Sequence, residues 1–160
     1  ETGNASFTGF GVKKILQPSK SLADYSTVSD ADVVIMRYAH VLLMIAEAEN
    51  EVNGPTEKAL KAINAVRTRS HQPAIDGTGL TQAELRERIR NEWRVETCFE
   101  GLRYFQLKRW KQLQQVVDGA VDPAYPSYIK VVRPAFEFFP LPQGEIDKAH
   151  GVLVQDPNYQ

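Results

Sequence analysis

The stretch that decides the fold reads "LTQAELRERIRNEWRVETCFEGLRYFQLKRW" and covers residues 80–110. Near its start Thr81 and Glu84 stand three positions apart, which is the spacing of a capping box at the first turn of a helix. Leucines flank this pair at the two positions that a hydrophobic staple requires. The pattern therefore predicts a helix over residues 81–99, which Gly101 breaks or kinks.

Two more helices are predicted upstream of this stretch. The first lies within "ADVVIMRYAHVLLMIAEAENEVNG", residues 31–54, and is apolar nearly all round, which is typical of a helix buried in a larger body. Gly54 and Pro55 end it. The second helix covers about 56–70, with an apolar stripe opposite charged residues. The apolar residues of the first helix that recur at helical spacing are Val34, Tyr38, Val41, Leu42, Ile45 and Ala48.

A fourth helix is predicted over 102–117, so the helices form two successive antiparallel pairs. This arrangement indicates a tetratricopeptide-like architecture, although the signature residues of that repeat are mostly absent. We expect an all-α, mainly helical fold of antiparallel helix pairs, followed by an extended C-terminal segment. The expected organisation is one domain, with an irregular lead-in over 1–31, a helical core over 32–118, and an extended tail over 119–160 that packs on the bundle.

Two carboxylates in the third helix raise the question of catalysis. Glu92 and Glu96 fall on its apolar face, one turn apart, where burial and mutual repulsion would raise the pKa of at least one carboxyl group. Buried charges are usually paired, however, so we favour structural ion pairs and keep acid/base catalysis as the alternative. The cations available on neighbouring helices are Arg37, Arg67, Arg69, Arg103 and Arg109.

Composition and motifs argue against several other functions. The formal net charge of −1 gives no general attraction to nucleic acid, and acidic partners compensate the arginines after residue 84. Examples are Glu84 with Arg88 and Glu87 with Arg90. The single cysteine, the scattered histidines and the missing nucleophile and phosphate-loop motifs predict no catalytic, cofactor or metal site. The candidate ligand-binding residues are two loop aromatics that could cover the apolar face of a sugar, Tyr125 and Tyr128.

Five blocks of the sequence, taken in order, carry a family resemblance. They are residues 36–54 "MRYAHVLLMIAEAENEVNG", 62–70 "AINAVRTRS", the opening stretch, 136–146 "FEFFPLPQGEI" and 154–159 "VQDPNY". Together they resemble the C-terminal part of SusD/RagB-type nutrient-binding outer-membrane lipoproteins of Bacteroidota. The resemblance implies a mostly helical fold without catalytic activity, and no cofactor. It also implies cell-surface exposure through a lipid anchor that this chain lacks, and a role as a substrate-capturing lid on a TonB-dependent transporter.

The resemblance also bears on single residues. "FEGLRYFQLKRW" is similar to a family motif, which implies structural roles for Glu96, Glu100, Arg103, Arg109 and Trp110. Together with Arg37 and Glu92 these residues form the expected ion-pair seam. Gln106 departs from the motif, since the family usually has Asp there. Members of the family are considerably longer than 160 residues, so the chain is interpreted as a C-terminal fragment.

Three functional hypotheses follow. The first is a glycan-binding component of a SusC/SusD-type uptake system, which captures oligosaccharide, or alternatively peptide, for the transporter. The second is a helical-repeat module that binds another protein. The third is an enzyme that uses Glu92 and Glu96.

Overall fold

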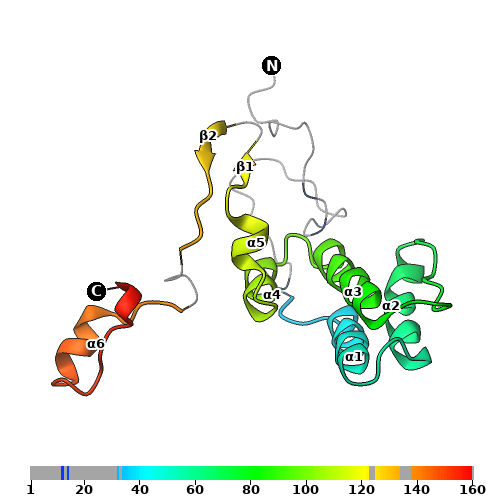
Figure 1. Cartoon of the computed structure of the whole chain (residues 1–160), viewed down its shortest axis with the longest axis horizontal. Helices are drawn as coiled ribbons and strands as arrows, with labels where there is room; N and C mark the ends of the chain where they lie inside the picture. The colour runs from blue at the N-terminus through cyan, green and yellow to red at the C-terminus, as the bar shows by residue number, and fades with distance from the viewer. Residues whose placement is uncertain are drawn as a thin grey trace. The chain divides into compact units, whose positions relative to one another are not determined.

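The computed structural model describes residues 12, 14, 32, 34–122, 125–133 and 138–159 (Figure 1). The chain divides into two compact units, residues 1–103 and 104–160, and each is described by itself. The mainly helical fold class is confirmed. The expected lead-in, 1–31, lies outside the described residues except at Val12 and Lys14.

The first unit contains three packed helices. They are α1 (Tyr38–Asn53), α2 (Glu57–Arg69) and α3 (Gln82–Glu96). Helix α1 packs against both α2 and α3, and the three lie side by side in Figure 1. The predicted pairing of the first two helices is therefore present, with α3 as a third neighbour.

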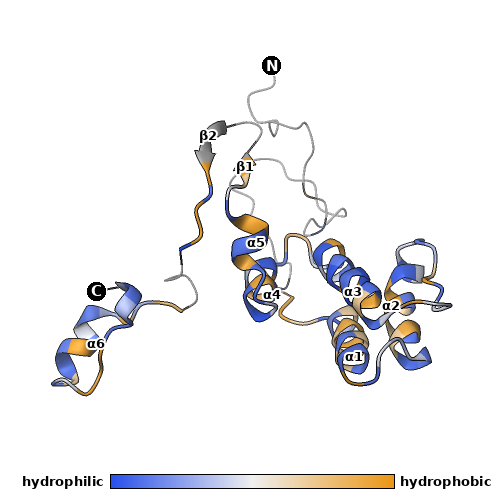
Figure 2. Ribbon diagram, in the orientation of Figure 1, coloured by the Kyte–Doolittle hydropathy of each residue, from blue (hydrophilic) through white to orange (hydrophobic). Residues whose placement is uncertain are grey.

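The core of this unit is built mainly from alanines and branched aliphatic side chains. Figure 2 shows polar and apolar stretches alternating along α2 and α3, as expected for helices with one buried face. The fully buried large apolar side chains are Leu43, Ile63, Val66, Leu85 and Ile89, and both α1 and α2 carry buried alanines. The buried apolar residues that accompany them are Ala39, Ala46, Ala59, Ala62, Ile75 and Trp93.

Helix α1 is buried on one side only, although the sequence predicted a helix buried nearly all round. Tyr38, Val41 and Ile45 are exposed, whereas Ala39 and Leu43 are buried. Because the helix is apolar all round, its spacing fits two stripes equally well. The stripe that contains Ala39, Leu43 and Ala46 is the buried one, and α1 packs against both α2 and α3. The helix also begins at Tyr38, after an exposed, non-helical segment that starts at Val34.

The capping box of α3 is present. The Thr81 N–H donates to Glu84 Oε2 at 2.9 Å, and the Glu84 N–H donates to Thr81 Oγ1 at 3.2 Å. The helix ends at Glu96, three residues earlier than expected. Thr97 donates its hydroxyl back to the Trp93 carbonyl at 2.6 Å, and Phe99 takes a left-handed conformation with φ 64°. The helix therefore ends before Gly101 is reached.

The second unit begins with two short helices in place of the single helix predicted over 102–117. Helix α4 covers Arg103–Arg109 and starts at the boundary between the units, and α5 covers Leu113–Val117. Between them Lys111 has φ 55°, a left-handed conformation that interrupts the helix. The second predicted helix pair, α3 with α4, spans the two units and stays a prediction.

A two-stranded ribbon follows, where no strand was predicted. Strands β1 (Val121–Asp122) and β2 (Tyr125–Ile129) are antiparallel, with Val121 opposite Ile129. Beside them the Lys130 N–H donates to the Ala120 carbonyl at 3.0 Å. The ribbon is too short to show the alternation of a half-buried strand, which explains the missed prediction.

The described part of the C-terminal segment contains helix α6 (Gln143–Lys148) and a 3-10 turn (Pro157–Tyr159), in a region where an extended segment was predicted. Two sequence blocks are joined here: Gln155 and Leu141 form a reciprocal pair of hydrogen bonds at 2.9 and 3.0 Å, and the Tyr159 hydroxyl donates to the Phe138 carbonyl at 2.8 Å. Packing of this segment on the helical core stays a prediction. Among the described helices, none has the length and apolar character needed to cross a membrane.

Candidate functional site

Glu96, at the end of α3, lies at the centre of a cluster of charges. Its Oε1 accepts hydrogen bonds from Arg37 Nη1 at 2.6 Å and from Arg69 Nη2 at 2.7 Å, and its Oε2 lies 2.8 Å from the same Arg69 nitrogen. The Glu96 side chain is only 6% exposed. The carboxylate thus joins the residue before α1 to the end of α2.

Glu100 forms the second half of this cluster, just after α3. Arg37 Nη2 lies 2.7 Å from its Oε1, His40 Nε2 lies 2.7 Å from its Oε2, and Lys14 Nζ lies 2.5 Å from its Oε1. Burial alone would raise the pKa of Glu100. The hydrogen bonds from Arg37, Lys14 and His40 outweigh that effect and lower the pKa to about 2.

The same cations bind backbone carbonyls at the end of α3 and just after it. Lys14 Nζ donates to the Glu96 and Cys98 carbonyl oxygens at 2.6 and 3.0 Å, and Arg37 Nη2 donates to the Glu96 carbonyl at 2.8 Å. Positive groups are favourable there because the last carbonyls of a helix lack partners and carry partial negative charge. Burial tends to lower the pKa of Arg37, but Glu100 and Glu96 raise it above its ordinary value.

His40 is a buried member of the cluster. Its Nδ1 lies 3.4 Å from the Arg37 N–H, which makes Nδ1 an acceptor and places the ring proton on Nε2, toward Glu100. The ring also lies 6.0 Å from that of Trp93. The imidazole therefore links the first turn of α1 to the charges after α3. We call Lys14, Arg37, His40, Arg69, Glu96 and Glu100 the Glu96–Glu100 cluster.

Glu92 has a separate partner. Its Oε2 accepts from Arg67 Nη1 at 2.7 Å, and Arg67 Nε donates to the Pro73 carbonyl at 2.8 Å. The two carboxylates that raised the question of catalysis thus each contact an arginine of α2. Fixed contacts with arginines are typical of structural ion pairs.

The remaining seam residues are Arg103, Arg109 and Trp110. Burial lowers the pKa of Arg103, and the nearby charge of Arg94 adds to the effect. In the second unit the Arg109 guanidinium lies 5.3 Å from the centre of the Trp110 ring, a cation–π contact. The backbone of Tyr125 and Tyr128 lies in β2, but their side chains are outside the described part of the chain. Their role in ligand binding stays a prediction.

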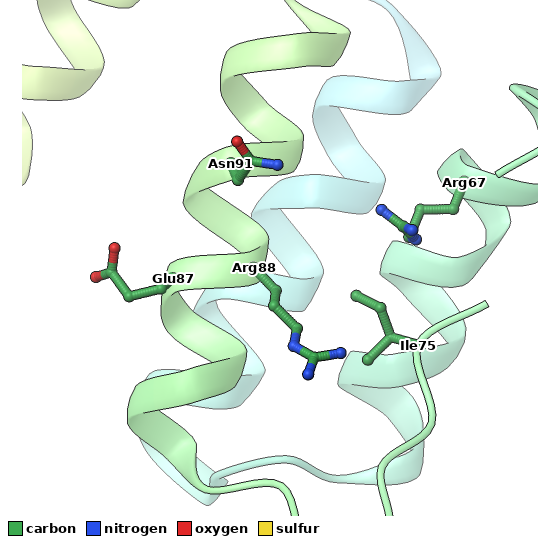
Figure 3. Close-up of a pocket in the computed structure, with 5 residues that line it drawn as sticks. All are labelled: Arg67, Ile75, Glu87, Arg88 and Asn91. Atoms are coloured by element: carbon green, nitrogen blue, oxygen red, sulfur yellow. The ribbon is translucent and has the colours of Figure 1, made fainter. Parts of the chain in front are cut away.

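A pocket of about 330 Å³ lies between α2, the loop after it and α3. Figure 3 shows the Arg67 and Arg88 side chains reaching toward the space between the helices, with Ile75 beside them and Glu87 directed away. Asn91 on α3 completes the lining. The pocket was not predicted from the sequence, because the spacing of Glu84 and Arg88 indicated an ion pair between them. The sequence did contain a signal for it, because Glu84 was also predicted to form the capping box and therefore competes as a partner for Arg88.

Lys14 was also missed, and no signal in the sequence identifies it. It stands in a lead-in without helical period, and it reaches the cluster only through the tertiary fold.

Comparison with known protein families shows the family to which this chain belongs. The family model described as "SusD family" matches residues 1–159. The chain belongs to the SusD family. Among its SusD-family relatives, SusD-like protein P2 of Formosa agariphila is 31% identical over 143 residues, which are 82% of this chain and 26% of the relative. SusD-like protein P25 of the same organism is 36% identical over 125 residues, covering 77% of this chain and 23% of the relative.

Solved structures of the SusD type are also similar. A SusD-like protein from Bacteroides fragilis matches with a TM-score of 0.68 and 29% identity, over 79% of this chain and 26% of that one. Surface glycan-binding protein A from Bacteroides thetaiotaomicron matches with a TM-score of 0.63 and 29% identity, over 79% of this chain and 25% of that one. The chain thus spans about a quarter of the length of these relatives.

Proposed function

We propose that these residues form the C-terminal portion of a nutrient-binding protein that captures oligosaccharides without chemically changing them. The observation that carries this proposal is the family match over residues 1–159. The similar chain named as a surface glycan-binding protein supports glycan as the ligand class. Peptide is the alternative ligand of the same function.

The charged residues of α3 fit a binding protein better than an enzyme. Glu92 and Glu96 accept hydrogen bonds from arginines, and the contacts of Glu96 join three helical segments. We assign these two carboxylates, together with Arg37 and Glu100, to holding the helices in place. Replacement of Glu92 or Glu96 is then expected to lower the stability of the fold. It is not expected to affect any catalytic activity.

The proposal extends to location and partner. We place the protein at the cell surface, on the outer membrane and attached through a lipid anchor, next to a SusC-like TonB-dependent transporter that receives the ligand. Membership of the SusD family supports this assignment. Protease treatment of intact cells, together with co-purification of the transporter, tests it. Protection of the protein in intact cells would contradict surface exposure.

A second candidate function is a protein-binding module. The observation that favours it is the apolar stripe on the outer side of α1, where Tyr38 is 74% and Val52 80% exposed. Such a stripe can bind the apolar face of another helix. It can coexist with ligand capture if the partner is another protein of the uptake system.

The test is a binding screen with the native gene product that contains these residues, against neutral and acidic polysaccharides and against peptides. Retarded migration in gels that contain one class of polysaccharide, followed by calorimetry, is the expected result. Binding of peptides alone would replace glycan as the ligand. Absence of binding to every member of the panel, with a stable complex to another protein, would favour the interaction module.

A further inference from the structure

The pocket between α2 and α3 has an unusual distribution of charge. Arg67 on one wall is already committed, because it donates to Glu92 and to the Pro73 carbonyl. Glu87, on the rim, contacts Arg90 at 2.8 Å on the side away from the pocket. These two charges of the lining are therefore balanced by their own partners.

Arg88 is different. Its potential partner on the same helix is Glu84, one turn earlier, but Glu84 Oε2 accepts from the N–H and the hydroxyl of Thr81 at 2.9 and 2.7 Å. Arg88 keeps only a longer-range attraction to that carboxylate. Among the described residues it makes neither a hydrogen bond nor an ion pair. A guanidinium with all five donors available thus reaches toward the pocket (Figure 3).

The wall opposite Arg88 is held in place before any ligand arrives. The Ile75 N–H donates to Asn64 Oδ1 at 2.7 Å, and Asn64 Nδ2 donates to the Ile75 carbonyl at 3.0 Å. This reciprocal pair fixes the loop on α2 and leaves the Ile75 side chain as an apolar wall of the pocket. A preformed wall lowers the entropic cost of binding.

The lining therefore combines an available guanidinium, a carboxamide on Asn91 and an apolar surface on Ile75. The volume of about 330 Å³ lies at the lower end of the roughly 300–1,000 Å³ typical of small-molecule sites. Such a pocket has room for one sugar ring. A guanidinium fork matches a carboxylate with two parallel hydrogen bonds, and an amide can both donate to and accept from ring hydroxyls.

We propose that this pocket binds a single acidic sugar unit of the hexuronate class. Arg88 binds its carboxylate, Asn91 a hydroxyl, and the apolar face of the ring lies against Ile75. The inference deepens the proposed function, on which it rests, by naming carboxylated glycans as a ligand class. Arg67 adds a second positive group whose position is fixed by Glu92.

The test uses nitrogen-15 labelled chain, with sodium glucuronate as the probe and glucose as the neutral control at matched ionic strength. Glucuronate is expected to shift the amide signals of Ile75 and Asn91 and the side-chain Nε–H signal of Arg88, in a saturable way. Glucose is expected to leave them unchanged. Arg88→Gln is expected to weaken glucuronate binding at least tenfold, since it removes a charged hydrogen-bond donor.

Arg94→Gln is the matched control, because Arg94 is an exposed arginine of the same helix that does not line the pocket. It is expected to bind glucuronate as the unchanged chain does. Asn91→Asp, which places a negative charge in the pocket, is expected to abolish the shifts. Amide spectra of the free variants show that each one is folded, since all three positions are exposed.

Equal shifts with glucose, or equal affinity of Arg88→Gln, would overturn the inference. Failure of the acidic-sugar site and failure of the proposed function give different results. Binding of neutral oligosaccharides by the native gene product, without any response of this pocket to glucuronate, would leave glycan capture standing and remove the acidic-sugar site. Saturable glucuronate shifts in a protein that binds no oligosaccharide would keep the site and remove glycan capture.

Discussion

Replacing Glu96 by Gln is expected to destabilise the chain by about 2–3 kcal/mol. The substitution keeps the size of the side chain but removes the charge that accepts from Arg37 and Arg69. The amide can still accept on one atom, but its nitrogen then faces donors. The cost therefore comes from lost charge pairing and mismatched hydrogen bonds, and no cavity is created.

The magnitude follows from how exposed each partner is. A hydrogen bond to a charged group contributes roughly 1.5–3 kcal/mol when partly buried, which applies to Arg37, 23% exposed. Arg69 is 62% exposed, so its contribution is below about 1 kcal/mol. Arg37 also keeps Glu100 as a partner, so the cost stays below the roughly 3–5 kcal/mol of an orphaned buried charge.

Urea unfolding followed by circular dichroism measures this change. Glu87→Gln is the matched control, because Glu87 lies on the same helix, is exposed, and contacts only Arg90 one turn away. It is expected to cost less than about 0.5 kcal/mol. If Glu96→Gln and Glu87→Gln lower the free energy of unfolding equally, with unchanged dependence on urea, the structural role of Glu96 is refuted.

Three further predictions concern the rest of the first unit. Because the folded-state pKa of Glu100 is lowered to about 2 from 4.5, its contribution, at most about 3 kcal/mol, is present above pH 5 and lost as the pH falls toward 2. The unfolding free energy should therefore drop more steeply over that range in the unchanged chain than in Glu100→Gln, and parallel curves would contradict the assignment. Thr81→Ala should cost about 1 kcal/mol by removing the cap of α3, whereas an exposed control, Thr68→Ala, should be nearly neutral in the same urea experiment. Leu43→Ala should cost about 2–5 kcal/mol through a cavity in the core, while Val52→Ala on the exposed side of α1 should cost under about 0.5 kcal/mol, and similar losses at both sites would refute the assignment of the inner face.

The sequence was sufficient to predict that the long helices exist because some of their start and stop signals are local. The cap at Thr81 and the Gly54–Pro55 stop depend on neighbours within one turn, and both act as predicted. The buried side of α1 could not be predicted, because two apolar stripes fit its period and only the packing against α2 and α3 decides which stripe is buried. The break at Lys111 was missed for a related reason, since no Gly or Pro marks the left-handed residue there.

For the charged residues, too, the sequence predicted what depends on local spacing but not what depends on tertiary packing. The sequence placed Glu92 and Glu96 on one face of a helix and named Arg37, Arg67 and Arg69 among their possible partners, but it could not match one with another. Pairing depends on how the helices pack, and Lys14 joins from a segment without any periodic signal.

Arg88 became available for a different reason. Glu84 satisfies two local rules at once, a capping box and a pair with Arg88 one turn later. Only the structure shows that the cap takes the Oε2 atom of its carboxylate. Conflicts of this kind mark positions where a charge pattern that looks balanced in sequence leaves one group available for a ligand.

The most direct test of capture without chemistry is calorimetric titration of the native gene product with a glycan selected in the screen, followed by chromatography of the recovered glycan. We expect saturable binding and a recovered glycan of unchanged length. We also expect the Glu92→Gln and Glu96→Gln variants to leave the length of the recovered glycan unchanged. Capture without chemistry would be contradicted if the unchanged protein shortened the glycan and a folded Glu96→Gln variant left it intact. That result would identify an enzyme.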